Sequence, residues 1–278
     1  MNRSIAEIEQ ILSTFQPPEL LDYPELERYS RDDIYRDFFG GGGLYLVVRM
    51  LRTMSLQSGQ VVLDLGCGKG ESSILMAQHF GVQVKALDLW TSAEYLEQKF
   101  AERGVSNHTA AIQMDATQPL PYAENEFDAI FCMNSFSFYG ANPGFLTHLL
   151  KHLKPGGCLC IGSEVLSIEF TPEQLLHPPY VYAFNLPPPN EQVNVFEGDF
   201  IKQHSPGWWR DFFQASGLVD VETCYELDDA EAIYQELVRY EYKNNIDPFD
   251  VQICLDQLEW GHTHQPHKSL FVLSARKR

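Results

Sequence analysis

One stretch organises this 278-residue chain: Val61-Val62-Leu63-Asp64-Leu65-Gly66-Cys67-Gly68-Lys69-Gly70-Glu71. Its first five residues are a short aliphatic run, typical of a parallel strand that is buried on both faces. The three glycines that follow let the backbone turn tightly and approach a ligand closely. A helical pattern then runs to a stop at Gly81. The stretch therefore predicts a strand, a glycine turn and a helix, an arrangement suited to a nucleotide-like ligand.

Two carboxylates in this stretch narrow the choice of ligand. Asp64 lies two residues before the first glycine, and Glu71 stands where the dinucleotide fingerprint has a third glycine or alanine. A carboxylate at a helix N-terminus repels a pyrophosphate. We therefore expect a ligand without a pyrophosphate, with positive groups that Asp64 or Glu71 can face.

Composition limits the partners. Thirty-eight acidic against twenty basic residues give a net charge of −18, which disfavours nucleic acid and anionic membrane surfaces. No apolar run is long enough to span a bilayer, and charges interrupt residues 1–16, so we expect a cytoplasmic protein. The six cysteines lack a Cys-x-x-Cys pair, which favours buried, reduced thiols. The histidines at 262, 264 and 267 lie in a loop without close acidic or cysteine ligands, so no metal site is predicted.

The remaining pattern alternates strands with helices. Strands are expected at 82–89, 110–114, 127–133, 158–163, 218–226 and 268–275, and helices at 92–103, 143–153, 206–216, 228–244 and 249–260. Such alternation indicates right-handed parallel crossovers and a doubly wound α/β sheet. Before it, residues 5–15 form an amphipathic helical pattern, and the four-glycine run 40–43 is interpreted as a hinge. We expect residues 20–43 to act partly as a lid, with static packing as the alternative.

Asp64-Leu65-Gly66-Cys67-Gly68-Lys69-Gly70 resembles the first motif of the class I S-adenosylmethionine-dependent methyltransferases. The resemblance covers about residues 44–165, more loosely 205–222 and 268–277. It implies a mostly parallel, seven-stranded, Rossmann-like sheet with an antiparallel last strand, and S-adenosylmethionine as cofactor. We expect a helical lid segment at 1–43 and the methyltransferase domain at 44–278, with insertions at about 166–204 and 228–267.

Candidate cofactor residues stand at the strand ends, where open α/β sheets bind ligands. The glycine loop contributes Gly66, Cys67, Gly68 and Gly70, with Asp64 before it. Asp88 ends the second strand, where a carboxylate accepts hydrogen bonds from ribose hydroxyls, and Leu89 and Trp90 offer an apolar face to adenine. The resemblance implies that Asp115, next to Ala116, accepts from the adenine amino group. It also implies that Asn134 faces the methionine part of the cofactor and the acceptor.

Candidate catalytic residues are less well marked. Relatives often have a histidine in the segment corresponding to Ser137-Phe138-Tyr139, which this chain lacks. In-line displacement at a sulfonium depends mainly on positioning and on excluding water. If the acceptor must first lose a proton, the candidate bases are Tyr139, Glu164 and His204. Each also has a structural interpretation, as a packed tyrosine, a strand-end acid and a loop histidine.

The function predicted from sequence is methyl transfer from S-adenosylmethionine to a small-molecule acceptor. The pattern leaves three alternatives: an NAD(P)-dependent oxidoreductase, a non-catalytic nucleotide-binding module, and methylene transfer to a lipid in the manner of the cyclopropane synthases that share this fold. Asp64 and Glu71 speak against the first. The aromatic and proline-rich insertions, which look built to enclose a ligand, speak against the second. The acceptor and the oligomeric state are not readable from the sequence.

Overall fold

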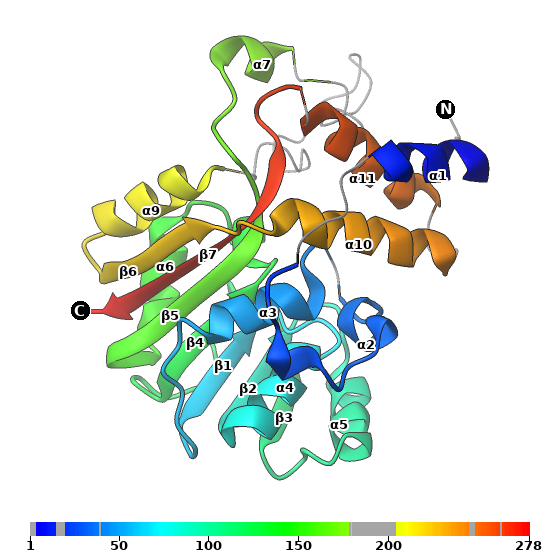
Figure 1. Cartoon of the computed structure of the whole chain (residues 1–278). Coiled ribbons are helices and arrows are strands. Elements are labelled where there is room, and N and C mark those ends of the chain that lie inside the picture. The colour runs from blue at the N-terminus through cyan, green and yellow to red at the C-terminus, as the bar shows by residue number, and fades with distance from the viewer. Residues whose placement is uncertain are drawn as a thin grey trace.

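The computed structural model describes residues 4–14, 20–38, 40–177, 179, 204–244, 248–261 and 263–278. Within them, seven strands form one sheet in the order β3-β2-β1-β4-β5-β7-β6 (Figure 1). Their bounds are β1 Val61–Leu65, β2 Gln83–Asp88, β3 Thr109–Gln113, β4 Phe127–Met133, β5 Leu153–Leu166, β6 Val219–Glu226 and β7 Lys268–Lys277. The first five strands are parallel, and β7 is antiparallel to both β5 and β6. The predicted fold class is confirmed.

Helices cover both faces of the sheet. Their bounds are α1 Ile5–Thr14, η1 Pro24–Leu26, α2 Arg31–Tyr35, α3 Gly43–Leu51, α4 Glu71–Phe80, α5 Ala93–Glu102, η2 Phe136–Tyr139, α6 Pro143–Leu150, α7 Pro172–Leu176, α9 Pro206–Ala215, α10 Ala230–Lys243 and α11 Pro248–Gly261. Apolar residues of α3, α4, α5 and α10 pack in one core cluster, whereas those of α6 and α9 pack in another. None of these described helices combines the length and apolar character needed to cross a bilayer.

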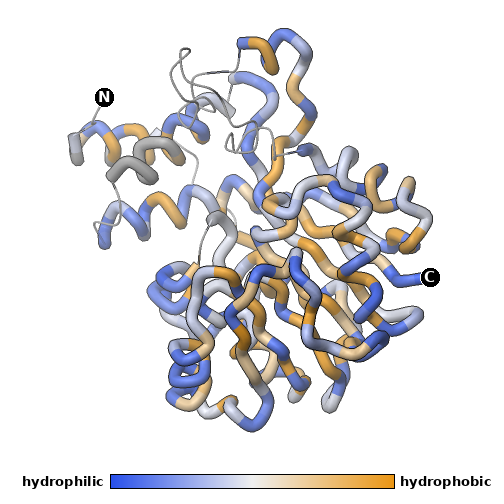
Figure 2. Tube along the Cα trace, turned by 180° about the vertical axis from the view of Figure 1, so that it is seen from behind, coloured by the Kyte–Doolittle hydropathy of each residue, from blue (hydrophilic) through white to orange (hydrophobic). Residues whose placement is uncertain are grey.

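The two clusters arise because side chains point alternately to the two faces of the sheet along each strand. Val62 and Phe131 belong to the α3 side, whereas Leu63 and Ile130 belong to the α6 side, because successive strand residues point to opposite faces. All four side chains are fully buried. Figure 2 shows hydrophobic residues gathered along the sheet and hydrophilic ones on the outer helices. The sheet is therefore buried on both faces, as the aliphatic runs indicate.

β5 is longer than the predicted 158–163. Its first part pairs with β4 through a register shift after Phe127, and its last residues pair with β7 as far as Leu166 opposite Lys268. Met133, the last residue of β4, pairs with Gly162. Residues 163–166 thus extend past the end of β4. They lie at the carboxyl edge, the edge of the sheet where the parallel strands end. A strand of this length needs a partner about 100 residues away, which local patterning does not reveal.

The N-terminal segment and the second insertion meet. Ile8 and Leu12 of α1 pack with Val238 of α10 and Leu255 of α11 in a small apolar cluster of their own. Figure 1 shows α1 beside α11, away from the strands. The predicted insertion 228–267 thus forms α10 and α11, while most of the insertion 166–204 lies outside the described residues.

Candidate cofactor and acceptor site

The glycine loop turns from β1 into α4 with left-handed backbone. Gly66, Gly68 and Gly70 have φ values of 71°, 52° and 83°. A Cβ on Gly66 would lie 2.5 Å from the Cβ of Ser135, and one on Gly70 would lie 2.9 Å from Leu96 and Phe100. Gly66 is therefore required by the approach of the β4 end, and Gly70 by the packing of α5.

Asp64 is turned into the protein. Its Oδ2 accepts hydrogen bonds from the hydroxyls of Ser72 and Ser73, both at 2.6 Å, and the residue is 1% exposed. Burial, aided by the negative charge of Asp88, raises the pKa of Asp64 to about 6, although the two hydroxyls oppose the rise. The carboxylate thus fastens the start of α4 beneath the loop.

Asp88 lies against the glycine loop. Its Oδ2 accepts from Gly68 N–H at 2.9 Å, and its Oδ1 accepts from Trp90 and Thr91 N–H, each at 2.8 Å. The next helix, α5, is capped by Ser92. A carboxylate oxygen has lone pairs beyond one such bond, so Asp88 keeps capacity for a ligand hydroxyl.

Apolar and acidic groups follow at the neighbouring strand ends. Leu89 and Trp90 are 49% and 73% exposed, and Trp90 contacts Phe138 of η2 edge-on at 6.4 Å. Asp115 Oδ1 accepts from Thr117 N and Oγ1, and these bonds hold the pKa of Asp115 below its usual range. Ala116 is buried beside it. The apolar groups stand at the edge where adenine is expected.

Asn134 joins the N-terminal segment to the sheet. It has φ of 53°, its Nδ2 donates to Gly41 O at 3.0 Å, and its Oδ1 accepts from Glu164 N–H at 3.2 Å. A Cβ on Gly41 would lie 2.6 Å from Tyr234. The glycine run was interpreted as a hinge; the structure shows a closely packed turn in which Gly40, Gly42 and Gly43 have φ of 82°, 98° and 49°.

A buried ion cluster lies on the other side of the loop. Glu71 pairs with Lys99 and Arg103 of α5, each at 2.9 Å, and Lys99 also pairs with Asp37 at 2.7 Å. Asp37 reaches Lys69 of the glycine loop at 3.4 Å. The expectation that Glu71 faces positive groups of a ligand is therefore wrong, because those groups belong to α5.

Comparison with known proteins fits this geometry. Residues 62–157 match a family described as a methyltransferase domain. Within residues 62–157, this chain therefore carries a methyltransferase domain. It is 30% identical over 126 residues to phosphoethanolamine N-methyltransferase 1 of Arabidopsis thaliana, covering 45% of this chain and 25% of that protein. It is 25% identical over 153 residues to a glycine/sarcosine/dimethylglycine N-methyltransferase of Actinopolyspora halophila, covering 49% and 27%. The chain thus spans about a quarter of the length of these relatives.

Solved structures share the fold. Phosphoethanolamine N-methyltransferase 2 of Haemonchus contortus, in complex with phosphomonomethylethanolamine and S-adenosylhomocysteine, has a TM-score of 0.67 at 16% identity over 97% of this chain and 60% of that chain. The [4+2]-cyclase SpnF has a TM-score of 0.64 at 16% identity over 98% and 93%. A second structure of that Haemonchus contortus enzyme is in complex with S-adenosyl-L-methionine, the cofactor that the sequence of this chain predicts. The cyclase shows that the fold alone does not fix the reaction.

Two of the three candidate bases, Glu164 and Tyr139, are held by neighbouring side chains. Glu164 Oε1 accepts from Gly41 N, Tyr234 Oη and Lys268 Nζ at 2.9 to 3.0 Å. Burial opposes ionisation, but Lys268 and these hydrogen bonds hold the pKa of Glu164 below its usual range. Tyr139 stacks on Phe145 at 4.3 Å, and burial raises the pKa of its hydroxyl. Neither group is set up to take a proton near neutral pH.

The third candidate, His204, sits just before α9. Its Nδ1 is 3.0 Å from Glu169 Oε2, and its ring stacks on Trp208 at 3.7 Å and 8°. Phe212 lies parallel to Trp208 at 5.7 Å, while Trp209 is buried. Trp208 thus packs against the rings of His204 and Phe212.

Several functional contacts were not anticipated. Asp37, Lys99, Glu169, Tyr234 and Lys268 all take part through partners at least 30 residues away in sequence. Lys69, inside the quoted motif, was the one visible signal for the ion cluster. Among the described residues, no group of three or more histidine, cysteine or acidic side chains could hold a metal ion.

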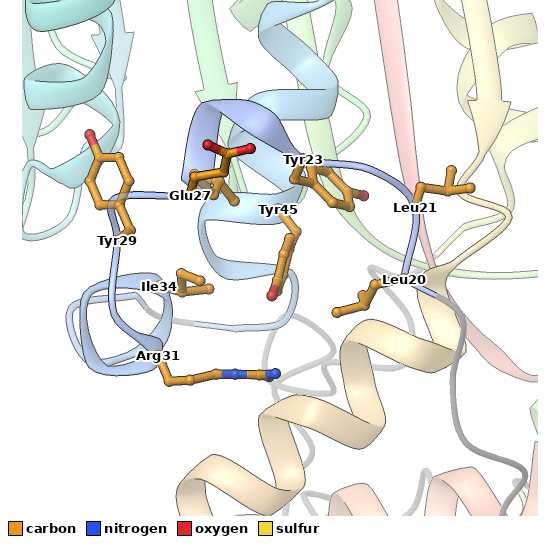
Figure 3. A pocket seen from close by; sticks show the side chains of 9 residues that line it. Leu20, Leu21, Tyr23, Glu27, Tyr29, Arg31, Ile34 and Tyr45 are labelled. Carbon is orange, nitrogen blue, oxygen red and sulfur yellow. The ribbon is translucent and has the colours of Figure 1, made fainter.

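A cavity of about 260 Å³ lies elsewhere, between η1, α2 and α3 (Figure 3). Figure 3 shows Tyr45 and Arg31 reaching toward the helix below them. Both are bound there, since Tyr45 Oη donates to Glu236 at 3.1 Å and Arg31 pairs with the same carboxylate. Its described lining residues include no strand end and no glycine-loop residue. The cavity lies where η1, α2 and α3 pack near α10.

Proposed function

We propose that this chain is an S-adenosylmethionine-dependent methyltransferase that acts on a small molecule. The observation that carries the proposal is the hydrogen bond of 2.9 Å from Gly68 N–H to Asp88, within a matched methyltransferase domain. It brings the acid suited to ribose hydroxyls against the loop whose backbone is open to a ligand. When bound, S-adenosylmethionine supplies an electrophilic methyl group on a sulfonium.

In this proposal, residues at different strand ends bind different parts of the cofactor. Asp88 accepts from a ribose hydroxyl, and exposed Leu89 covers the adenine ring. Asp115 and Ala116 border the far side of adenine. The loop from Gly66 to Gly70 and Asn134 line the methionine part. Asp64 supports the site from beneath, because its carboxylate binds Ser72 and Ser73.

Residues 20–43 form the lid of the site in this proposal. Two contacts support it: Asp37 pairs with Lys69 of the glycine loop, and Gly41 is held by Asn134 and Glu164 at the ends of β4 and β5. A lid fixed in this way excludes water from the methyl donor.

The acceptor class follows from charge and relatives. A net charge of −18 supports a small molecule over nucleic acid. Relatives named for phosphoethanolamine and for glycine, sarcosine and dimethylglycine suggest amines as the first acceptors to test.

The test is transfer from methyl-labelled S-adenosylmethionine by the full chain. Phosphoethanolamine, glycine and sarcosine are supplied singly, followed by a small-metabolite extract, with Asp88→Ala as the control. Label should appear in a small molecule with wild type and be strongly reduced with the variant. Label found only in protein or RNA would contradict the proposal.

A further inference from the structure

The carboxyl edge continues beyond the cofactor on the side of β5 and α9. β5 runs past the end of β4, and Glu169 lies three residues after its last residue, Leu166. His204 immediately precedes Ser205, the N-cap of α9. Because β6, which follows α9, is parallel to β4, α9 begins at this same edge. Glu169 and His204 therefore meet at the ligand-binding edge, one strand beyond β4.

Ring contacts connect this place with the glycine loop. The imidazole of His204 is 5.9 Å from Trp209, and Trp209 is 5.9 Å from Phe136. Phe136 follows Ser135, which borders Gly66 and donates to Leu65 O at 2.8 Å. Three successive contacts thus run from the loop to His204. They connect the imidazole with the end of β4 through two buried rings, Trp209 and Phe136.

The contact with Glu169 selects one tautomer of the imidazole. An ionised carboxylate only accepts hydrogen bonds, so Nδ1, at 3.0 Å from Oε2, carries the proton. Burial opposes ionisation, but the hydrogen bonds of His204 and Ser205 hold the pKa of Glu169 below its usual range. Nε2 then holds the lone pair, and a second group orients it, as in other carboxylate–histidine pairs.

The ring is also fixed in its plane. Trp208 stacks on it at 3.7 Å and 8°, and Trp209 meets it edge-on at 80°. The imidazole remains partly open, since 29% of its side-chain surface is exposed. Among the described residues, Glu169 is the charged group in contact with it. A fixed and partly exposed imidazole is what a general base requires.

We propose that His204 and Glu169 form a general-base pair for the methyl acceptor, an inference that rests on the function proposed above. The acceptor is an ammonium or a hydroxyl that must lose its proton before attack. Its proton passes to Nε2 while its lone pair bonds to the methyl carbon, and the carbon–sulfur electron pair returns to sulfur. The resulting imidazolium is stabilised by Glu169 and releases the proton to water.

A purely structural role makes different predictions. Glu169 Oε1 also accepts from Ser205 N–H at 2.5 Å, so the pair could serve only to fix the start of α9. In that case, Ser205→Ala, which removes the N-cap hydroxyl that bonds Trp208 N, would reduce turnover as much as a change at His204. His264 offers a matched control, because it too stacks on a tryptophan, Trp260, at 4.0 Å, but bonds a threonine hydroxyl rather than a carboxylate.

The experiment compares wild type with His204→Gln, Ser205→Ala and His264→Gln as full chains. Calorimetry with S-adenosylhomocysteine reports the fold and the cofactor site. Nitrogen-15 NMR of labelled histidine reports which imidazole nitrogen of His204 is protonated. Turnover with labelled S-adenosylmethionine, using the acceptor found in the metabolite extract, is followed across pH.

We expect a protonated Nδ1 and a bare Nε2, with equal S-adenosylhomocysteine affinity in all four proteins. His204→Gln should lose at least about 100-fold in turnover and the acidic limb of its pH profile, whereas the two controls keep both. The proposal is overturned by a protonated Nε2, or by His204→Gln turnover within about threefold of wild type. Wild type that fails to bind S-adenosylhomocysteine, or binds it and methylates nothing, contradicts the function proposed above and with it the role of the pair.

Discussion

The two sides of the carboxyl edge use their polar groups differently. On the cofactor side, formed by the ends of β1, β2 and β4 with residues 66–70, the carboxylates of Asp64 and Glu71 bind Ser72, Ser73, Lys99 and Arg103 of the protein itself. On the acceptor side, formed by residues 163–169 and the start of α9, the pair Glu169–His204 remains partly open to solvent. The first side is a rigid cradle, and the second offers a group that can exchange a proton.

This difference shows that an acidic residue in a binding motif need not touch the ligand. The ordinary interpretation of Asp64 and Glu71 assigns both to a positive ligand. Their partners, however, come from α4 and α5, and they fix the shape of the loop instead. In the proposal above, the proton transfer is carried out by His204 and Glu169, which the motif does not contain.

The largest effect is expected from a substitution in the buried ion cluster of Glu71, Lys99, Arg103 and Asp37. Glu71 is 4% exposed, and Glu71→Gln removes the carboxylate that pairs with Arg103 and that shares Lys99 with Asp37. This change should lower the free energy of unfolding by about 3 kcal/mol. Glu124→Gln, which removes an exposed pair with Lys151, should cost less than about 1 kcal/mol. Urea unfolding measures both, and equal losses would remove the distinction between buried and surface pairs.

The second prediction concerns a substitution in the backbone turn of the glycine loop, residues 66–70. Gly66→Ala should weaken S-adenosylhomocysteine binding about 100-fold, equivalent to about 2.7 kcal/mol, because the new Cβ collides with Ser135. Gly156→Ala is the matched control, since φ is 72° there but no atom lies within 4 Å of a new Cβ. It should show only the backbone strain, about 1–2 kcal/mol of stability, and normal binding. If both variants bind equally, the close approach at Gly66 has no role.

The third prediction tests whether residues 20–43 act as a lid over the cofactor site. Asp37→Asn removes the charge that pairs with Lys69 and Lys99, and should raise the S-adenosylhomocysteine dissociation constant about tenfold. Glu25→Gln breaks another ion pair of the same segment, with Arg52, but not one to the glycine loop, and should leave the constant unchanged. Calorimetry separates the two cases. An unchanged constant in Asp37→Asn would favour static packing of residues 20–43.

The smallest effect is a pH dependence at Asp64. Its folded pKa, about 6, lies above the unfolded value, so the folded state binds the proton more tightly and loses stability as pH rises from the unfolded to the folded pKa. Relative to Asp64→Asn, wild type should lose about 1 kcal/mol between about pH 5 and pH 7. Urea unfolding of both proteins at several pH values gives the difference. A constant difference would show that Asp64 is ionised throughout.

Backbone features were readable from the sequence. β4 was predicted at 127–133 and is Phe127–Met133, because an aliphatic run bounded by turn residues fixes a buried strand locally. Gly81 ends α4 with φ of 63°, as its position after the helical pattern indicates. The positions of the strand ends follow from such local signals.

Pairings between distant segments were not readable. The extension of β5 depends on β7, and the pair Glu169–His204 joins residues 35 positions apart. Lys99 serves both Glu71 and Asp37, a geometry that only the packing of α5 against the lid creates. The sequence indicates His204 as a candidate base, but no pattern in it predicts the carboxylate that orients this histidine.

Calorimetric titration of the wild-type chain with S-adenosylhomocysteine, beside NAD and an Asp88→Ala variant, tests the central claim most directly. The cradle formed by Asp88 and the glycine loop should bind S-adenosylhomocysteine in the micromolar range, and the variant should lose that binding. Binding of NAD without S-adenosylhomocysteine would contradict the assignment of this edge to a methyl donor, and the methyltransferase function would fall with it.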